Sequence, residues 1–417
     1  MSNVHYKTVP NVEGFYSLNE PAIGSAVHLN DSTPKLFQPL TIRDATFKNR
    51  IWVSPMCQYS SKDGFASDWH LVHLGGFATR GAGAITVEAS AVVPEGRISP
   101  EDLGIWSDEH IAPLKRIVDF VHTQGTLIGI QLAHAGRKAS TWAPWVAMHL
   151  NGAPTVKNHE VPKELGGWPG KVYGPSAIKW SDDYPEVTEI TLEGIQTVKD
   201  AFVAAAKRCK EIGFDFIELH GAHGYLMNEF MSPVSNHRTD QYGGSLANRM
   251  RLPLEITQAV RAVWDKPLFF RISATEWAEH ELGPEKDESS GEYKWWGIEQ
   301  TNILAGELKN AGVDLLDVSS GGNYSKQKIT VGPAYQAPFA EAVKKAHPDL
   351  LVGTVGLITE PQQAEDLLQQ GKGDVVYLAR ELLRRVDFPL IAASELGAVV
   401  KPANQYQLAW RRMLHKA

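Results

Sequence analysis

Short apolar runs alternate with amphipathic stretches along most of the chain from Leu40 onward. The runs are rich in β-branched residues and lack a strict alternation of apolar and polar positions. Such runs are typical of strands that are covered on both faces, as in a parallel sheet. They predict eight strands, at residues 51–53, 84–87, 127–130, 216–219, 268–272, 315–318, 351–354 and 375–378.

Helical periodicity separates these strands. Apolar positions three and four residues apart predict helices at residues 111–124, 192–212, 248–263, 298–311, 337–347 and 361–370. Several of them end in a glycine just before the next strand, which is typical of a helix C-cap. This alternation predicts an α/β fold, a single (β/α)8 TIM barrel. The alternative is a Rossmann-type sheet, but no Gly-x-Gly-x-x-Gly turn follows an early strand.

Three segments divide the chain. Residues 1–36 are polar and weakly periodic, so we expect an N-terminal extension that lies on the surface or is partly disordered. The barrel is expected to span residues 37–400, followed by a C-terminal tail at 401–417. Long insertions follow the third and fifth predicted strands, at 142–174 and 277–296. Because function in such barrels lies on the loops after strand ends, both insertions are predicted lids or pocket walls, with a solvated surface loop as the alternative.

Composition excludes several classes of protein. The net charge of −7 and the pI near 6.1 provide no basic face for nucleic acid or anionic membranes. Only two cysteines occur, Cys57 and Cys209, which excludes a disulfide framework, a four-cysteine zinc site and a Cys-ligated iron–sulfur cluster. No apolar run approaches the ~20 residues of a membrane span. We see no signal peptide and expect a cytoplasmic protein.

Two histidines and a tyrosine follow the fourth predicted strand. His220 and His223 lie three residues apart, and Tyr225 comes two residues later. If this strand ends in a pocket, two imidazole N–H donors can hold a carbonyl oxygen while the phenol delivers a proton. The alternatives are a metal pair or a polar loop. A metal is disfavoured because no third ligand is evident and Arg271 would point at a cation.

Two other features predict an anionic ligand. Arg271 places a charge inside an otherwise apolar strand, so it is expected to face an anion or an electron-rich acceptor. Small residues follow the last two strands, at Gly356 and Ala379, and Arg380 comes next. Small residues at these two strand ends are the usual phosphate site of a TIM barrel, because backbone N–H groups can approach the anion closely.

Several motifs together resemble one known family. The sequence His-Gly-Ala-His-Gly-Tyr-Leu at 220–226 is followed by Phe-Met-Ser-Pro-Val-Ser-Asn-x-Arg-x-Asp-x-Tyr-Gly-Gly-Ser at 230–245. With Gln-Leu-x-His-x-Gly-Arg at 131–137 and Arg-Ile-Ser at 271–273, the chain resembles the old yellow enzyme family of FMN-dependent ene-reductases from about Leu36 to its C-terminus. Ser-Pro-Met-Cys-Gln-Tyr-Ser at 54–60 is similar to the cysteine-bearing, thermophilic-like branch of that family.

The resemblance implies a tightly bound FMN across the barrel mouth. Gly356, Ala379 and Arg380 would hold its phosphate, Gln131 the pyrimidine part of the ring, and Arg271 the region of N1 and O2. The other side of the flavin would be lined by Ser54, Pro55, Met56, Cys57 and Ala89. No metal is implied.

The resemblance also implies a reaction. The enzyme would take a hydride from NADPH or NADH and reduce the C=C bond of α,β-unsaturated carbonyl and similarly activated small molecules. His220 and His223 would hold the substrate oxygen, Tyr225 would protonate Cα, and Tyr59 would be a second phenol in contact with the substrate. A dienoyl-CoA reductase relative would need a cysteine cluster that this chain lacks. A flavin store without turnover is a further alternative.

Two positions depart from the family pattern. Ala379 stands where the family usually has glycine before the arginine. Leu408 stands where the branch often carries an arginine that reaches a neighbouring subunit, although Arg411 and Arg412 lie close by. The sequence therefore leaves the oligomeric state open, with a homodimer or a higher homo-oligomer compatible with the tail.

Overall fold

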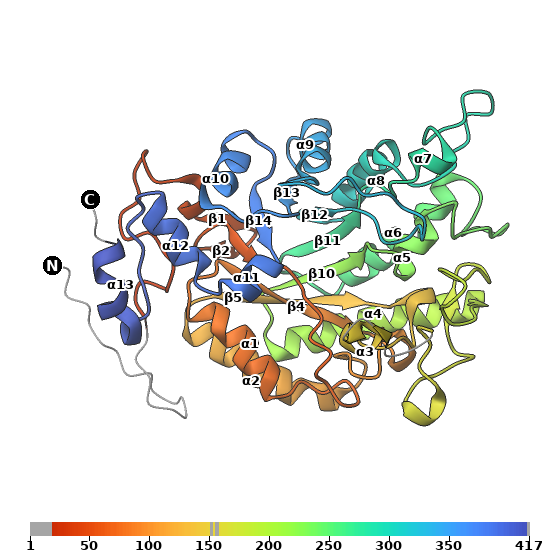
Figure 1. The fold of residues 1–417 in the computed structure, drawn as a ribbon, viewed down its shortest axis with the longest axis horizontal. Coiled ribbons are helices and arrows are strands. Elements are labelled where there is room, and N and C mark those ends of the chain that lie inside the picture. Colours follow the sequence, from red (N-terminus) through yellow and green to blue (C-terminus); the bar gives the residue numbers. More distant parts are fainter. Residues whose placement is uncertain (1–18, 151–152, 155–157, 415–417) are drawn as a thin grey trace.

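Eight parallel strands close into a barrel at the centre of the structure (Figure 1). The structure is a computed structural model that describes residues 19–150, 153–154 and 158–414. The strands follow the order β10-β11-β12-β13-β14-β3-β4-β5 around the barrel. Their bounds are β3 Ile51–Val53, β4 Ala84–Ala91, β5 Leu127–Ala133, β10 Phe216–Gly221, β11 Leu268–Ser273, β12 Leu315–Ser319, β13 Leu351–Thr354 and β14 Val375–Leu378. The predicted (β/α)8 barrel is confirmed.

Helices surround this barrel, and the six predicted ones are confirmed to within two residues at each end. They are α2 Ile111–Thr123, α4 Leu192–Ile212, α6 Leu246–Arg261, α8 Ile298–Asn310, α9 Ala337–Ala346 and α10 Pro361–Gln369. The structure adds α1 Asp68–Ala78, α3 Pro144–Ala147, α5 Leu226–Met231, α7 Glu279–Leu282, α11 Arg380–Arg384, α12 Phe388–Glu395 and α13 Gln407–Leu414. None of the described helices is long and apolar enough to cross a membrane.

Helix α1 was missed because two adjacent glycines, Gly75 and Gly76, interrupt its pattern. Glycine disfavours a helix interior by about 1 kcal/mol relative to alanine. The tertiary structure supplies the reason for one of them. A Cβ at Gly75 would lie 2.8 Å from Cε1 of Phe120 on α2, so the glycine allows the two helices to pack closely.

A hairpin closes the N-terminal end of the barrel. Strands β1 (Leu40–Ile42) and β2 (Ala45–Phe47) pair antiparallel. The ring of Phe47 lies 4.4 Å from that of Trp52, centroid to centroid, and both side chains are fully buried inside the barrel floor. Aromatic packing at this end leaves the opposite end, where the strands finish, for function.

The described part of the expected N-terminal extension is anchored to the rest of the protein at a few points. Ile23 and Leu36 are fully buried, and the backbone N–H of Gly24 donates to the carbonyl of Lys401 at 2.8 Å. Residues 27–32 between these points are exposed, as expected for a surface segment, whereas residues 1–18 lie outside the described residues. The sequence did not reveal the anchoring residues, because they are too few to show periodicity.

The barrel interior changes from apolar to charged along the strands. Side chains two residues apart on a strand share a face, so Glu218 and His220 point to the same interior as Phe216. Phe216 packs in the aromatic floor, and Glu218 and His220 follow toward the mouth. On the neighbouring strands, Arg271 pairs in register with both His220 and Asp317. The charged layer therefore lies directly beneath the mouth.

Both insertions lie at the end of the barrel opposite the hairpin (Figure 1). The first contains α3, the short pair β6 (His149–Leu150) and β7 (Ala153–Pro154), and β8 (Tyr173–Gly174), which pairs with β9 (Thr188–Glu189). The second contains α7 and an antiparallel bridge between Lys286 and Tyr293. Their position agrees with the prediction that they border the functional end of the barrel.

Candidate active site

The histidine pair and the tyrosine after β10 converge at the barrel mouth. The ring centroids of His220 and His223 lie 5.3 Å apart, and those of His220 and Tyr225 lie 5.0 Å apart. His220 ends the inward-facing row of β10, while His223 adopts a left-handed backbone conformation with φ +62°. Its N–H donates to Ser273 Oγ at 2.8 Å, which fixes this turn against β11. The structure thus brings the three predicted groups together.

Both imidazoles are held neutral by their surroundings. Burial lowers the pKa of His220 well below its usual range, and the nearby charge of Arg271 lowers it further. The same two causes, in the same order, lower the pKa of His223. Nδ1 of His220 is buried and has no hydrogen-bond partner among the residues described. Nε2 of His223 lies 2.8 Å from Ser319 Oγ.

Two phenols lie beside the histidines. Burial raises the pKa of Tyr225 well above its usual range, with Cys57 and Asp102 adding to the effect, so the phenol keeps its proton near neutral pH. Tyr59 follows β3 in a left-handed conformation, φ +47°, and its pKa is also raised, mainly by burial. A protonated phenol next to an oxygen-binding pair is a suitable general acid.

Cys57 is present as a thiol rather than a thiolate. Burial raises its pKa well above the usual range, and Asp102 and Glu88 raise it further. The predicted neighbours Ser54 and Ala89 are buried at the same strand ends, and Ser54 Oγ has no hydrogen-bond partner within the described part of the chain. This edge of the mouth therefore offers a neutral wall.

A charged cluster lies beneath the mouth, and sequence reasoning identified two of its members, Arg271 and Gln131, but missed Asp317 and Glu218. Arg271 Nε lies 3.0 Å from Asp317 Oδ2, and Gln131 Nε2 donates to Glu218 Oε1 at 2.7 Å. Burial raises the pKa of both carboxyls, and the charge of Asp317 raises that of Glu218 further, whereas Arg271 opposes the rise at Asp317. Glu218 is therefore the carboxyl that keeps a proton, and Asp317 is the counter-ion of Arg271.

The guanidinium of Arg271 retains donors for a ligand. Within the described residues it faces Asp317 through Nε alone and donates no hydrogen bond to another protein group. A buried guanidinium with unused donors is costly unless a ligand accepts from them. Asp317 places a charge inside an otherwise apolar strand, two residues after Leu315. The same kind of signal identified Arg271.

Lys138 is another residue that was missed. Its Nζ donates to the carbonyls of His223, at 2.8 Å, and Gly322, and its ammonium lies 4.6 Å from the ring centre of Trp180. Burial lowers the pKa of Lys138 to about 7. Lys138 comes one residue after the predicted motif at 131–137, which begins in β5. This position was the clue that the sequence offered.

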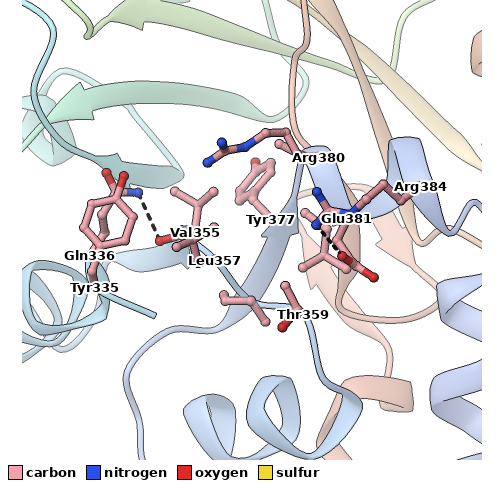
Figure 2. A pocket seen from close by; sticks show the side chains of 13 residues that line it. Tyr335, Gln336, Val355, Leu357, Thr359, Tyr377, Arg380, Glu381 and Arg384 are labelled. Carbon is pink, nitrogen blue, oxygen red and sulfur yellow. Dashed lines mark hydrogen bonds and ion pairs between the residues drawn. The ribbon is translucent and has the colours of Figure 1, made fainter. Parts of the chain in front are cut away.

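A second pocket lies at the ends of β13 and β14 (Figure 2). It has a volume of about 120 Å³ and is lined by Gly356, Ala379 and Arg380, as predicted for an anion, together with Tyr335 and Gln336. Figure 2 shows the guanidinium of Arg380 extending across the pocket above Tyr377. Gly356 has φ +119°, and a Cβ there would lie 2.8 Å from Gln336 Nε2, so glycine is required.

No metal centre is evident in the part of the chain that the structure describes. There, no three His, Cys, Asp or Glu side chains are grouped so that they could hold an ion. The two histidines instead share the mouth with phenols and a guanidinium.

Comparison with known proteins decides the family. Residues 35–397 match the NADH:flavin oxidoreductase / NADH oxidase family of FMN proteins. The chain belongs to this family. An NADH:flavin oxidoreductase of Gibberella zeae is 48% identical over 383 residues, which cover 90% of this chain and 89% of the relative. An NADPH dehydrogenase of Bacillus subtilis is 43% identical over 378 residues, which cover 90% and 99%. The resemblance to the old yellow enzyme family is thereby confirmed.

Solved structures share the fold. Morphinone reductase superposes with a TM-score of 0.66 at 26% identity, over 89% of this chain and 92% of that protein. A 2-naphthoyl-CoA reductase gives a TM-score of 0.72 at 22% identity, over 89% of this chain. The chain spans about half of that longer protein, 54% of its length, and the likeness concerns the fold alone.

As a member of this family, the protein is an oxidoreductase that uses FMN with NADH or NADPH as hydride donor. The residues present fit this cofactor. Ser54 Oγ and His220 Nδ1 are buried polar atoms without a protein partner in the described chain, and Arg271 retains unused donors. The pocket beneath Arg380, at the ends of β13 and β14, has the size and polarity for a phosphate.

Proposed function

We propose that this flavin oxidoreductase is an ene-reductase. It takes a hydride from NADPH or NADH and reduces the C=C bond of α,β-unsaturated carbonyl and similarly activated small molecules. The observation that carries the proposal is the convergence of two neutral imidazoles and a protonated phenol, with ring centroids 5.3 and 5.0 Å apart, at the mouth of the barrel. An enone needs these groups, because its oxygen gains charge while its Cα gains a proton.

His220 and His223 bind the carbonyl oxygen of the substrate. A neutral imidazole donates one N–H, and two such donors aimed at the same oxygen stabilise the enolate charge that develops as the alkene is reduced. Neutrality matters because an imidazolium would also attract unrelated anions. The low pKa of both histidines, caused first by burial, keeps them in the donor form that does not carry charge.

Tyr225 delivers the proton to Cα, and Tyr59 contacts the substrate from the other side. The phenol of Tyr225 is protonated near neutral pH because burial raises its pKa. Its ring centroid is 5.0 Å from that of His220. The proton donor and the oxygen-binding histidine can therefore contact one small molecule at the same time, at its Cα and at its carbonyl oxygen. Positioning of this kind converts proton delivery into a step within one complex.

FMN, when bound, accepts and returns the hydride. Gln131 and Arg271 would hold its ring system, and Gly356, Ala379 and Arg380 would hold its phosphate. The remaining wall would consist of Ser54, Pro55, Met56, Cys57 and Ala89. Arg271 would favour negative charge on the reduced ring, and Asp317 would limit how strongly it does so. The presence of Cys57 supports assignment to the cysteine-bearing, thermophilic-like branch of the family.

Isotope labelling tests the proposal. Purified protein should be yellow and should bleach anaerobically with NADPH or NADH. Turnover of 2-cyclohexenone with deuterated NADPH should place deuterium at Cβ of cyclohexanone, and turnover in D2O should place it at Cα. A flavin that is reduced by nicotinamide but leaves 2-cyclohexenone and a nitroalkene unchanged would contradict ene-reduction. A His220→Ala/His223→Ala variant serves as the control and should lose enone turnover while flavin reduction continues.

A further inference from the structure

A third pocket extends outward from the two phenols of the site. We call it the lid pocket. It has a volume of about 370 Å³, with Tyr59 and Tyr225 at its inner end and Trp142, Ala147, Met148 and Tyr184 among its walls. The outer walls come from the first insertion and from the segment that follows it. Because Tyr225 is the proposed acid, any substrate at the reaction centre has the lid pocket beside it.

Backbone hydrogen bonds hold the walls in place. The N–H of Trp142 donates to the carbonyl of His159 at 3.1 Å, and the N–H of His159 donates to the carbonyl of Asp183 at 2.9 Å. On the other side, the N–H of Thr141 donates to the carbonyl of Ile98 at 2.7 Å. The lid pocket is therefore formed by segments tied to one another, as is usual for sites that bind small molecules.

Aromatic rings form a large part of the lid pocket's lining, and they belong to Tyr59, Trp142, His159, Tyr184 and Tyr225. The ring of Tyr184 lies 4.7 Å from that of His159. No aspartate or glutamate belongs to the described lining. Aromatic walls attract another aromatic ring through stacked and edge-to-face contacts, worth about 0.5–1.5 kcal/mol each beyond the burial of area.

The charge of the lid pocket does not suit a nicotinamide dinucleotide. Lys138 is the one lysine or arginine in the described lining, and two of its donors already bind the carbonyls of His223 and Gly322. Within the described lining, two phosphates would find no lysine or arginine besides Lys138, whereas a neutral ring would find apolar and aromatic contacts. The occupant favoured by the lining is therefore uncharged and aromatic.

We propose that the lid pocket binds an aryl substituent of the substrate, so that the enzyme prefers aryl-substituted enones. This rests on the proposed ene-reductase function, since the aryl group reaches the pocket only when the enone carbonyl lies at His220 and His223. Ala147 and Met148 act as specificity-determining residues. A larger side chain at 147 fills the pocket, and a smaller one at 148 widens it.

Matched substrates test this inference with the FMN-loaded enzyme. 4-Phenylbut-3-en-2-one and 1-phenylbut-2-en-1-one each replace one methyl group of pent-3-en-2-one by phenyl. We expect kcat/KM for at least one aryl enone to exceed that for pent-3-en-2-one by about tenfold, the scale of a filled apolar pocket. Ala147→Phe should lower this aryl-to-methyl ratio about tenfold, mainly through KM, and Met148→Ala should shift the ratio for a naphthyl analogue upward.

Leu165→Phe is the control. Leu165 lies in the same insertion, is 59% exposed and does not line the lid pocket, so added bulk there should leave the ratio within twofold of the wild type. Binding of the saturated ketone 4-phenylbutan-2-one, followed by the flavin spectrum, gives a readout without turnover. Its Kd should rise about tenfold in Ala147→Phe, while that of pentan-2-one changes less.

Other results would overturn the inference. An aryl-to-methyl ratio unchanged by Ala147→Phe in a variant with wild-type melting temperature excludes an aryl occupant. Slower flavin reduction by NADPH, with the ratio unchanged, assigns the lid pocket to the dinucleotide instead. Failure of the proposed function looks different, because then neither the aryl enones nor pent-3-en-2-one is reduced although NADPH bleaches the flavin.

Discussion

His223 and Ser319 are joined across the ends of β10 and β12, with Nε2 and Oγ 2.8 Å apart. This bond occupies one nitrogen of the imidazole, so Nδ1 is the nitrogen left for a substrate oxygen. A neutral His223 donates from Nδ1 only if Nε2 accepts from the serine hydroxyl. Ser319 therefore orients the histidine ring. Its hydroxyl also lies 3.3 Å from Gln336 Oε1, and its single proton serves only one of these two acceptors at a time.

Ser319→Ala should weaken the oxygen-binding site. Loss of one hydrogen bond costs about 0.5–1.5 kcal/mol, so the Kd of a phenol that binds above the flavin should rise roughly two- to tenfold. The long-wavelength band of the phenol complex measures this Kd. Ser320→Ala is the matched control, because Ser320 Oγ donates to Gln336 at 2.6 Å and does not contact His223. Equal weakening in both variants would show a general disturbance of the loop.

Tyr225→Phe should separate the two halves of the reaction. Removing a positioned general acid typically costs 10²- to 10⁴-fold, and we expect a loss at the lower end of this range for enone reduction. Flavin reduction by NADPH needs no proton from the phenol and should change by less than about threefold. Stopped-flow measurement of each half-reaction checks this. Equal slowing of both would make Tyr225 a structural residue.

Asp317→Asn should raise the midpoint potential of the flavin. The substitution removes the counter-ion of Arg271, whose Nε lies 3.0 Å from Asp317, so more of the positive charge acts on the reduced flavin. A shift on the order of 30 mV corresponds to about 1.4 kcal/mol for a two-electron couple. Spectroelectrochemistry measures it.

Glu218→Gln provides the control for that shift. Burial and the charge of Asp317 raise the pKa of Glu218 to the extent that it is protonated at neutral pH, so the amide replaces a carboxyl that was already uncharged. The midpoint potential should then change little. A larger shift in Glu218→Gln than in Asp317→Asn would show that Glu218, and not Asp317, carries the negative charge.

Arg380→Ala should weaken binding of FMN more than binding of riboflavin. A charge-assisted hydrogen bond to phosphate contributes about 1.5–3 kcal/mol, which is roughly ten- to a hundredfold in Kd. Riboflavin lacks the phosphate and reports the contribution of the ring alone. Arg384→Ala is the control, since Arg384 lines the same pocket but pairs with Glu381 at 2.6 Å. Fluorescence of released flavin measures both affinities.

Binding of a non-ionising ketone should show no histidine titration. Burial lowers the pKa of both His220 and His223, so neither gains a proton as the pH falls from 8 to the ordinary histidine range near 6.5. The Kd of cyclohexanone, followed by the flavin spectrum, should therefore show no step from either imidazole between about pH 5.5 and 8, although Lys138, with a pKa of about 7, titrates in this range. A step centred near pH 6.5 that disappears in His220→Ala or His223→Ala would mean that an imidazole is solvated and titrates normally.

Local patterns predicted most of the secondary structure. Strands β3, β13 and β14 and helix α4 have the predicted bounds, because short β-branched runs and long amphipathic stretches are local signals. Helix α1 escaped because two glycines interrupt its pattern, and one of them, Gly75, allows a contact with Phe120 that no local pattern reveals. The anchoring of residues 19–36 escaped because isolated apolar residues such as Ile23 are buried by partners far away in the sequence.

The candidate site was predictable where residue type alone implies chemistry. His220, His223 and Tyr225 indicate an oxygen-binding site and a general acid, and they follow a strand end, where a TIM barrel places its functional residues. Lys138 was missed because a basic residue after a strand has no evident role until its neighbours are known, and Asp317 was missed although, like Arg271, it places a charge inside an apolar strand. The insertion at 142–174 was predicted to be a lid or pocket wall, but its position beside Tyr59 and Tyr225 required the tertiary structure.

By itself, the sequence determined the eightfold alternation of strand and helix, the end of the barrel that carries chemistry, and the family. These follow from periodicity within single segments and from motifs that are continuous in the chain. Only the tertiary structure decided which charges meet. Arg271 faces Asp317 because β11 and β12 pair in register, and Tyr59 meets Trp145 because β3 and the insertion after β5 share the mouth. Such contacts depend on how strands register and helices pack, which no single segment specifies.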